Sequence, residues 1–198
     1  MKLYHGTNCS SAMNIVNNGI DLKYSKPYLD FGAGFYTTTS YDHAARLAIR
    51  VTNKYNSRYK KNELPYIVEV DFKFSKDIEL STTTYPHNSK KWGEFVLNNR
   101  LTPEILMKYS ITEHNQDARY DVCVGEIADG SITNIAYEVN SGRIMPDEVD
   151  YKKFLRDNGE VYSQQYSFHT SKAVSCIKVL SCGTIKNINK YSKVMRGR

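Results

Sequence analysis

Expected strands and short helices follow one another in this chain without the regular strand–helix–strand alternation of a doubly wound protein. The clearest strand is YIVEVDFKF (66–74), in which apolar and polar residues alternate. Further strands are expected at 2–6, 35–39, 120–128 and 165–170. No GxGxxG or GxxxxGK turn follows a strand, which argues against a Rossmann or P-loop domain. The pattern favours an α+β domain with two small sheets.

Helices are expected where a capping residue precedes apolar residues at helical spacing. Ser10 or Ser11 should cap a helix that ends at Gly19, and Asp42 should cap a helix over 43–55. The other helices are expected at 89–100, 102–109, 147–158 and 171–180, the last of which runs towards a final strand.

Size and composition indicate one folded domain. The chain has 198 residues, of which 40% are hydrophobic and 24% are charged, and a chain of this length can bury a real core. No apolar run approaches the ~18–20 residues of a membrane-spanning helix. The N-terminus lacks the apolar stretch of a signal peptide. We therefore expect a cytoplasmic protein with no membrane partner.

The cysteines give no sign of a disulfide scaffold or a zinc module. The chain has four of them and no CxxC pair, and no histidine stands at zinc-finger spacing from any of them. Free thiols in a reducing compartment and the absence of a bound metal are the simplest expectation.

The net charge of +6 is concentrated at the C-terminus. Residues 186–198 contain five lysines and arginines and no acid. Removing these five from the 27 basic residues leaves 22 against 21 acids, a charge of +1. The sequence is therefore divided into a near-neutral domain, 1–185, and a basic tail, 186–198. Such a tail is often only solvated, although it can also capture a nucleic acid or an acidic partner.

Two segments near the N-terminus combine glycine with residues that can hold a ligand. His5-Gly6-Thr7 ends the first expected strand and offers a ring nitrogen, a close backbone approach and a hydroxyl. Asp30-Phe-Gly-Ala-Gly-Phe-Tyr-Thr-Thr-Thr-Ser40 places two glycines before an aromatic pair. Its glycines can form a turn that leaves Tyr36 facing a cleft. An ordinary strand-to-helix turn and an ordinary hairpin are the alternatives.

A third segment, QYSFHT (165–170), places polar residues along a strand. Alternation puts Gln165, Ser167 and His169 on one face and the two aromatic residues on the other. A buried amide on such a face needs a partner or a ligand. The alternative is an edge strand whose polar face meets water.

Taken together, these segments resemble a known family. The series YHGT, GAGFYTTTS and QYSFHT resembles the ADP-ribosyltransferase superfamily and is most similar to its DUF3990 group. Trp92, Phe95, Asn98-Asn99-Arg100 and the stretch from Tyr120 to Asp129 extend the resemblance over most of residues 3–180.

The resemblance implies a split α+β fold, with two small antiparallel sheets and flanking helices around an NAD cleft. It implies that His5 bonds the nicotinamide-side ribose, that Gly6 meets the nicotinamide amide, and that Tyr36 stacks on the nicotinamide ring. Gln165 takes the third position, where the superfamily usually has glutamate. Further NAD contacts are expected from Thr7, Gly34, Phe35, Thr37 and Ser167, with Arg100, Asp121 and Asp129 as supporting residues.

The expected activity is NAD-dependent mono-ADP-ribosyl transfer to an unidentified protein or nucleic acid, as in a bacterial or phage toxin with a cognate antitoxin. NAD is expected as the substrate, without a metal. Gln165 keeps the acceptor oxygen of a glutamate but cannot take a proton, so a base would have to lie elsewhere. Asp121, Glu126 and Asp129 are the candidates, with a surface or structural role as the alternative for each. The alternatives are a weakly active or inactive NAD- or ADP-ribose-binding protein and a nucleic-acid-directed relative. If Gln165 is catalytic, glutamate at this position should preserve or raise NAD hydrolysis; if Gln165 is structural, glutamate should destabilise the fold.

Overall fold

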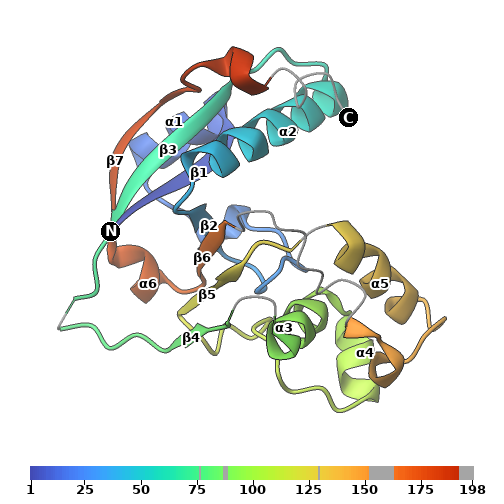
Figure 1. Ribbon diagram of the computed structural model, residues 1–198. Helices are drawn as coiled ribbons and strands as arrows, with labels where there is room; N and C mark the ends of the chain where they lie inside the picture. Colours follow the sequence, from blue (N-terminus) through green and yellow to red (C-terminus); the bar gives the residue numbers. More distant parts are fainter. Residues whose placement is uncertain (76, 87–88, 129, 152–162, 192–198) are drawn as a thin grey trace. The chain divides into compact units, whose positions relative to one another are not determined.

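The computed structural model describes the chain except for residues 76, 87–88, 129, 152–162 and 192–198 (Figure 1). The chain divides into two compact units. Unit 1 consists of Met1–Asp21, Tyr36–Glu79 and Val174–Arg198, and unit 2 of Leu22–Phe35 and Leu80–Ala173. Each unit is therefore built from segments that are distant in the sequence.

The fold class is α+β, as the sequence predicts, but the strands do not form two small antiparallel sheets. Seven strands follow the order β4-β5-β6-β2-β1-β3-β7 in one mixed sheet. The sheet is mixed because β4 (Thr82–Thr84) pairs in parallel with β5 (Val122–Glu126). The connection between these strands contains helices α3 (Lys90–Arg100) and α4 (Pro103–Lys108), and a parallel pair requires such a long crossover.

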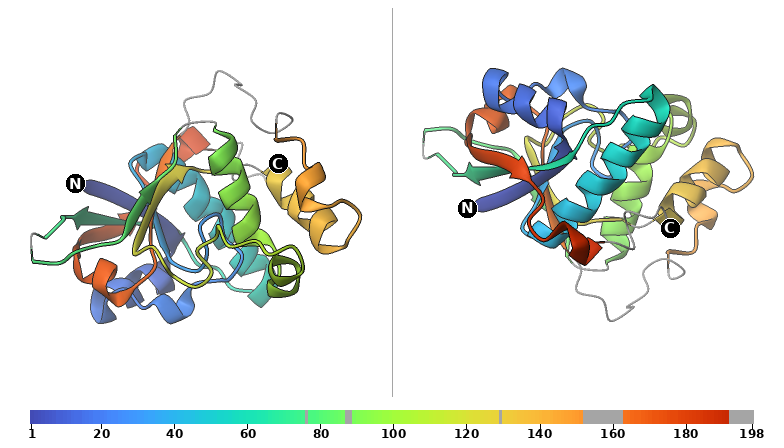
Figure 2. Two further views of the ribbon diagram at one scale, coloured as in Figure 1. Left: turned by 90° about the horizontal axis from the view of Figure 1, so that it is seen from below. Right: turned by 90° about the horizontal axis from the view of Figure 1, so that it is seen from above.

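Unit 1 is a layered arrangement of strands and two helices. Antiparallel pairing joins β1 to β2 and β3, and β3 to β7. Helices α1 and α2 lie on opposite faces of these strands (Figures 1 and 2). The elements are β1 (Lys2–Asn8), α1 (Cys9–Asn18), β2 (Phe35–Thr38), α2 (Tyr41–Tyr59), β3 (Pro65–Phe72) and β7 (Ile177–Thr184).

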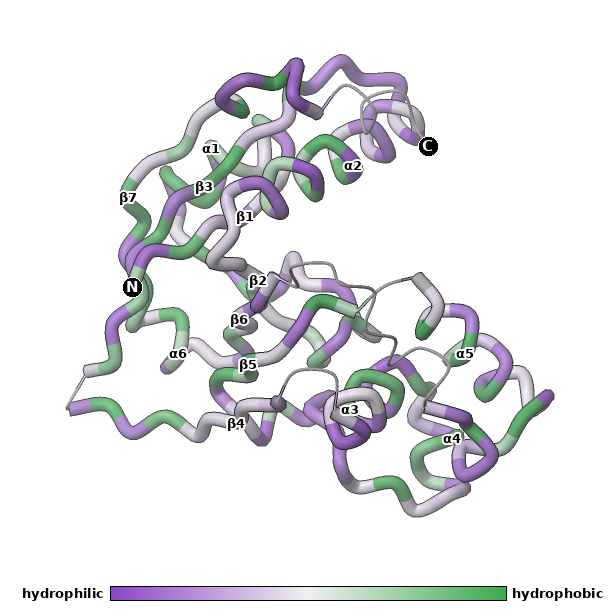
Figure 3. The backbone as a smooth tube through the Cα atoms, viewed as in Figure 1, coloured by the Kyte–Doolittle hydropathy of each residue, from purple (hydrophilic) through white to green (hydrophobic). Residues whose placement is uncertain are grey.

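The two helices of unit 1 begin at caps other than the expected ones. The side chain of Asn8, rather than Ser10 or Ser11, caps α1, and Gly19 ends it as expected. Ser40 caps α2 in place of Asp42. Both caps accept a hydrogen bond from the backbone N–H three residues further on, which is the usual capping geometry. The first half of α2 contains both hydrophobic and hydrophilic residues, and its second half is mostly hydrophilic (Figure 3).

The C-terminal segment after residue 185 takes part in the core of unit 1. A 3₁₀ helix covers Ile188–Tyr191, and the Tyr191 ring, 3% exposed, packs with Ala45, Ala48 and Ile67. Its hydroxyl donates to Asp42 Oδ1 at 2.6 Å. Although this segment is basic, the Tyr191 side chain anchors it in the core of unit 1, and residues 186–191 are therefore not a solvated tail.

Unit 2 contains the remaining described elements. Its helices α3 and α4 match the expected helices at 89–100 and 102–109, whereas α5 was not expected. The predicted helix at 171–180 is wrong in its second half, since α6 ends at Ser175 and the chain continues as β7, paired with β3. Of the helix expected at 147–158, residues 152–158 lie outside the described part. The helices and strands are α3 (Lys90–Arg100), α4 (Pro103–Lys108), α5 (Gly130–Asn140), β6 (Gln164–Phe168), β4 and β5, and α6 (Ser171–Ser175) begins in unit 2 and ends in unit 1.

None of the helices in the described part of the chain is long and apolar enough to cross a membrane.

Candidate functional site

Strands β1 and β2 bring His5 and Tyr36 together in unit 1. The strands pair antiparallel, with Tyr4 opposite Thr38, and His5 Nδ1 lies 2.7 Å from the Tyr36 carbonyl oxygen. A carbonyl only accepts, so Nδ1 carries the proton and Nε2 is the acceptor nitrogen of the neutral ring. Burial lowers the pKa of His5, which keeps the ring neutral near pH 7. The two residues that the sequence singled out are therefore neighbours.

The close backbone approach at Gly6 is made by helix α2. A Cβ atom on Gly6 would lie 2.0 Å from the Ala44 carbonyl oxygen and 2.9 Å from the Ala48 nitrogen. Glycine is therefore required here for packing. The neighbouring candidates Thr7 and Thr37 are both buried. The expected contact of Gly6 with nicotinamide stays a prediction.

The glycine-rich segment before Tyr36 is held at both backbone groups of Gly34. The Gly34 N–H donates to Ser25 Oγ at 2.6 Å, and the Ser25 hydroxyl donates to the Gly34 carbonyl at 2.9 Å. A Cβ atom on Gly34 would lie 2.7 Å from His169 Nδ1, so the imidazole fills the space that a side chain would occupy. Phe35, the next residue, is buried. This turn of unit 2 is therefore held by hydrogen bonds to Ser25 and by packing against His169.

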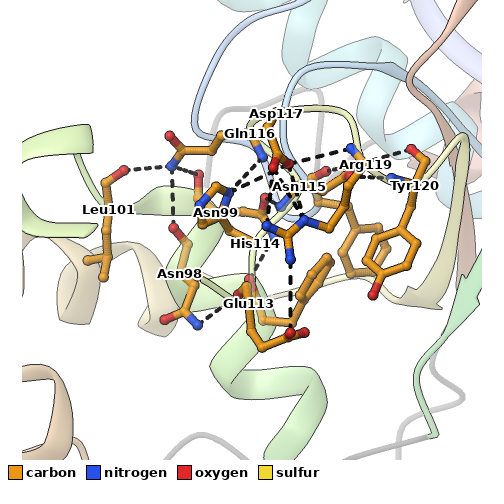
Figure 4. A network of polar contacts seen from close by, with 12 residues as sticks. Asn98, Asn99, Leu101, Glu113, His114, Asn115, Gln116, Asp117, Arg119 and Tyr120 are labelled. Carbon is orange, nitrogen blue, oxygen red and sulfur yellow. Dashed lines mark hydrogen bonds and ion pairs between the residues drawn. The ribbon is translucent and has the colours of Figure 1, made fainter. Parts of the chain in front are cut away.

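A polar network in unit 2 supports the same segment from another side (Figure 4). Asn115 Nδ2 donates to the Phe31 carbonyl, and the Asn115 N–H donates to Asn99 Oδ1 at 2.7 Å. Gly32 adopts φ +87°, and a Cβ atom there would lie 2.6 Å from the Asn115 carbonyl oxygen. Gln116 Nε2 donates to the carbonyls of Asn98, Asn99 and Leu101 at the end of α3. The network fixes the backbone around Phe31, and the sequence resemblance did not include its central residues, Asn115 and Gln116.

Gln165 lies on β6 with its amide nitrogen between two oxygen acceptors. Gln165 Nε2 donates to Asp30 Oδ2 and to the Glu126 carbonyl, each at 2.8 Å. The side chain is only 5% exposed. The sequence predicted that a buried amide would need a partner or a ligand, and unit 2 supplies partners for the nitrogen.

Ser167 and His169 follow on the same face of the segment, as strand alternation predicts. Ser167 Oγ lies 2.8 Å from His169 Nε2, and His169 Nδ1 lies 2.7 Å from the Ala33 carbonyl. The ring is therefore the neutral Nδ1–H tautomer, which accepts from the serine hydroxyl. Burial lowers the pKa of His169 to about 4. Ser167 is fully buried, and this bond gives it a structural role; the expected NAD contact stays a prediction.

Two of the three expected supporting residues can be located, and both make ion pairs inside unit 2. Arg100 Nη2 pairs with Asp30 Oδ1. Asp121 accepts from the Ser81 N–H at 2.8 Å and from Lys172 Nζ at 2.7 Å. Burial by itself would raise the pKa of Asp121, but these donors outweigh it and hold the pKa below its usual range. Asp129 lies outside the described residues.

Unit 2 also has a surface cavity of about 480 Å³, and Asn98 is the one residue of the sequence resemblance among those that line it. Its lining is acidic and aromatic, and includes Glu94, Glu113, Asp147, Tyr109 and Tyr151. Across the described ranges, no three His, Cys, Asp or Glu side chains are grouped so that they could hold a metal ion.

The fold and these residues define an α+β protein with a histidine–tyrosine pair on adjacent strands and a buried glutamine on a third. A family model described as "Protein of unknown function (DUF3990)" matches residues 1–179. The chain therefore belongs to the DUF3990 family, as the sequence motifs indicated. No curated protein and no solved structure matches it significantly.

Proposed function

We propose that this DUF3990 protein is an NAD-dependent mono-ADP-ribosyltransferase. The observation that carries the proposal is the hydrogen bond of 2.7 Å between His5 Nδ1 and the Tyr36 carbonyl. It supports the proposal because it fixes the neutral Nδ1–H tautomer of an imidazole that lies next to a half-buried tyrosine. These are the residue types that the resemblance to the ADP-ribosyltransferase superfamily assigns to the ribose and to the nicotinamide ring.

In this proposal the bond between ribose C1′ and the nicotinamide nitrogen breaks, and its electron pair leaves with neutral nicotinamide. The ribose passes through an oxocarbenium-like state, as in glycoside hydrolysis. The resemblance assigns the roles: His5 accepts a hydrogen bond from a ribose hydroxyl, Tyr36 stacks on the leaving ring, and Gln165 offers its amide oxygen to the ribose. The acceptor attacks C1′ and loses its proton to a base other than Gln165.

A second candidate is a protein that binds NAD or ADP-ribose without transferring it. The contacts of Gln165 favour this alternative, because its amide nitrogen already serves the fold through Asp30 and the Glu126 carbonyl. Without a carboxylate at this position, the cationic ribose is less stabilised by roughly 1 kcal/mol, the difference between a charged and a neutral hydrogen bond. A protein or nucleic-acid acceptor, a toxin role and a cognate antitoxin are further parts of the proposal that depend on transfer.

The test measures NAD binding by calorimetry and nicotinamide release by chromatography on the full chain. Replacing Tyr36 by alanine should weaken NAD binding about tenfold, because it removes both ring stacking and buried area. Tyr55→Ala is the matched control, since Tyr55 is also a half-buried tyrosine of unit 1 and its ring lies 4.9 Å from that of Tyr59. Binding without nicotinamide release would favour the second candidate. Absence of both would exclude the two NAD proposals together.

A further inference from the structure

We infer that Asp30 is a positioning residue for the proposed reaction and acts through Gln165. The inference rests on the proposed function. Asp30 begins the glycine-rich segment, and neither the motif nor the resemblance gave it a role. In unit 2 its carboxylate contacts the side-chain nitrogen of the glutamine that the proposal places at the ribose.

The two partners of Gln165 determine which end of its amide faces inward. A carboxylate oxygen and a backbone carbonyl both accept hydrogen bonds and donate none. Only the –NH₂ end of the amide can therefore face Asp30 and the Glu126 carbonyl, and both of its hydrogens are used there. The Oε1 oxygen consequently points away from both partners. The environment therefore selects one amide orientation, with the nitrogen towards Asp30 and the acceptor oxygen turned away from it.

Asp30 is itself held in place, so it can fix another side chain. Its Oδ1 accepts from Arg100 Nη2, and its Oδ2 accepts from the Ala128 N–H at 3.1 Å as well as from Gln165. Arg100 Nη1 in turn donates to Thr133 Oγ1. The carboxylate thus receives three donors and is 7% exposed. An amide in its place would turn one donor group towards another donor.

Preorganised acceptors contribute to catalysis because they need not reorient when charge develops. With its nitrogen restrained, Gln165 presents its oxygen in one direction before the ribose arrives. The competing explanation is that the contact only fastens β6 to the Asp30 segment and has no effect through the oxygen. The two explanations differ in whether the effect of Asp30 depends on the presence of Gln165.

A double-mutant cycle tests this dependence. Nicotinamide release from NAD is measured for the wild type, Asp30→Asn, Gln165→Ala and the double variant. We expect Asp30→Asn to lower kcat about tenfold in the wild-type background and to change it by less than about twofold in the Gln165→Ala background. Asn115→Ala is the control, because Asn115 is a buried polar residue of the same unit that donates to the Phe31 carbonyl and not to Gln165. Its effect should be the same in both backgrounds.

Melting curves followed by Trp92 fluorescence show whether each variant is folded at the assay temperature. If Asp30→Asn does not fold, ¹⁵N-labelled wild-type protein supplies the second measurement. Saturating NAD should then shift the Gln165 side-chain –NH₂ signals, since an amide that accepts through oxygen is polarised at nitrogen. Unshifted signals would overturn the inference, and so would equal effects of Asp30→Asn in both backgrounds of an active enzyme. A wild type that neither binds NAD nor releases nicotinamide would instead refute the proposed function on which the inference rests.

Discussion

The buried imidazole of His169 should make unit 2 sensitive to mild acid. In the folded protein its pKa is lowered from 6.5 to about 4, chiefly by burial. The unfolded chain therefore binds a proton at a higher pH than the folded chain, and stability falls as the pH falls. The decline begins near pH 6.5 and is complete below about pH 4.

The magnitude follows from the two pKa values. A difference of about 2.5 pKa units corresponds to about 3 kcal/mol of unfolding free energy when the transition is complete. At pH 6 the loss should be about 0.8 kcal/mol, and at pH 5 about 2 kcal/mol. His5 adds to this loss in unit 1, because burial lowers its pKa as well.

Urea unfolding at a series of pH values measures this loss in the correct unit. The chain has one tryptophan, and Trp92 is buried in unit 2 with its Nε1 donating to the Glu126 carbonyl at 3.2 Å. Its fluorescence therefore reports on the unit that contains His169. His169→Gln should flatten the pH dependence between 7 and 5, whatever its stability at pH 7.

Phe168→Leu is the matched control, since it alters a fully buried neighbour on the same segment without removing a titrating group. It should lower stability equally at every pH and keep the wild-type slope. The reasoning is refuted if His169→Gln retains the wild-type decline, because the proton would then bind elsewhere.

Three further predictions concern single contacts. Gln165→Glu should lower the melting temperature at pH 7, because it sets a carboxylate against Asp30, and the expected loss of unfolding free energy is about 2–4 kcal/mol. This loss relative to wild type should shrink at lower pH as the new acid is protonated. Gly6→Ala should lower the unfolding free energy by about 1–3 kcal/mol in a urea titration followed by circular dichroism. Gly183→Ala should lower it far less, because a Cβ atom on Gly183 meets nothing within 4 Å. Tyr191→Ala should lower the unfolding free energy by about 3–5 kcal/mol in the same assay, whereas a chain that ends at Tyr191 should be as stable as the full chain. Equal losses from both changes would contradict the assignment of the Tyr191 ring as the anchor.

Local patterns predicted the elements that carry the candidate residues, because strand alternation and helix capping depend on neighbours in the sequence. The strands around His5, Tyr36 and Gln165 were expected from such patterns, and so was the common face of Gln165 and Ser167. The helix expected at 171–180 was wrong where pairing with β3 decides the conformation, since tertiary contacts override a short helical preference. The charge of the C-terminal segment also suggested a solvated tail. The spacing of three between Ile185, Ile188 and Tyr191 instead marks a face that packs in the core.

No local sequence pattern could predict the partner of Gln165, because Asp30 is 135 residues away in the sequence. This contact changes which side chain we expect position 165 to require. The resemblance to the ADP-ribosyltransferase superfamily led us to expect Gln165 at a glutamate position, where restoring the charge would help the proposed reaction. Next to Asp30, however, the position requires a donor, which an ionised glutamate lacks. The neutral amide is therefore the side chain that satisfies Asp30 with its nitrogen while keeping an acceptor oxygen. Residues 30 and 165 form one hydrogen-bonded pair, and a change of charge at either residue alters the requirement at the other.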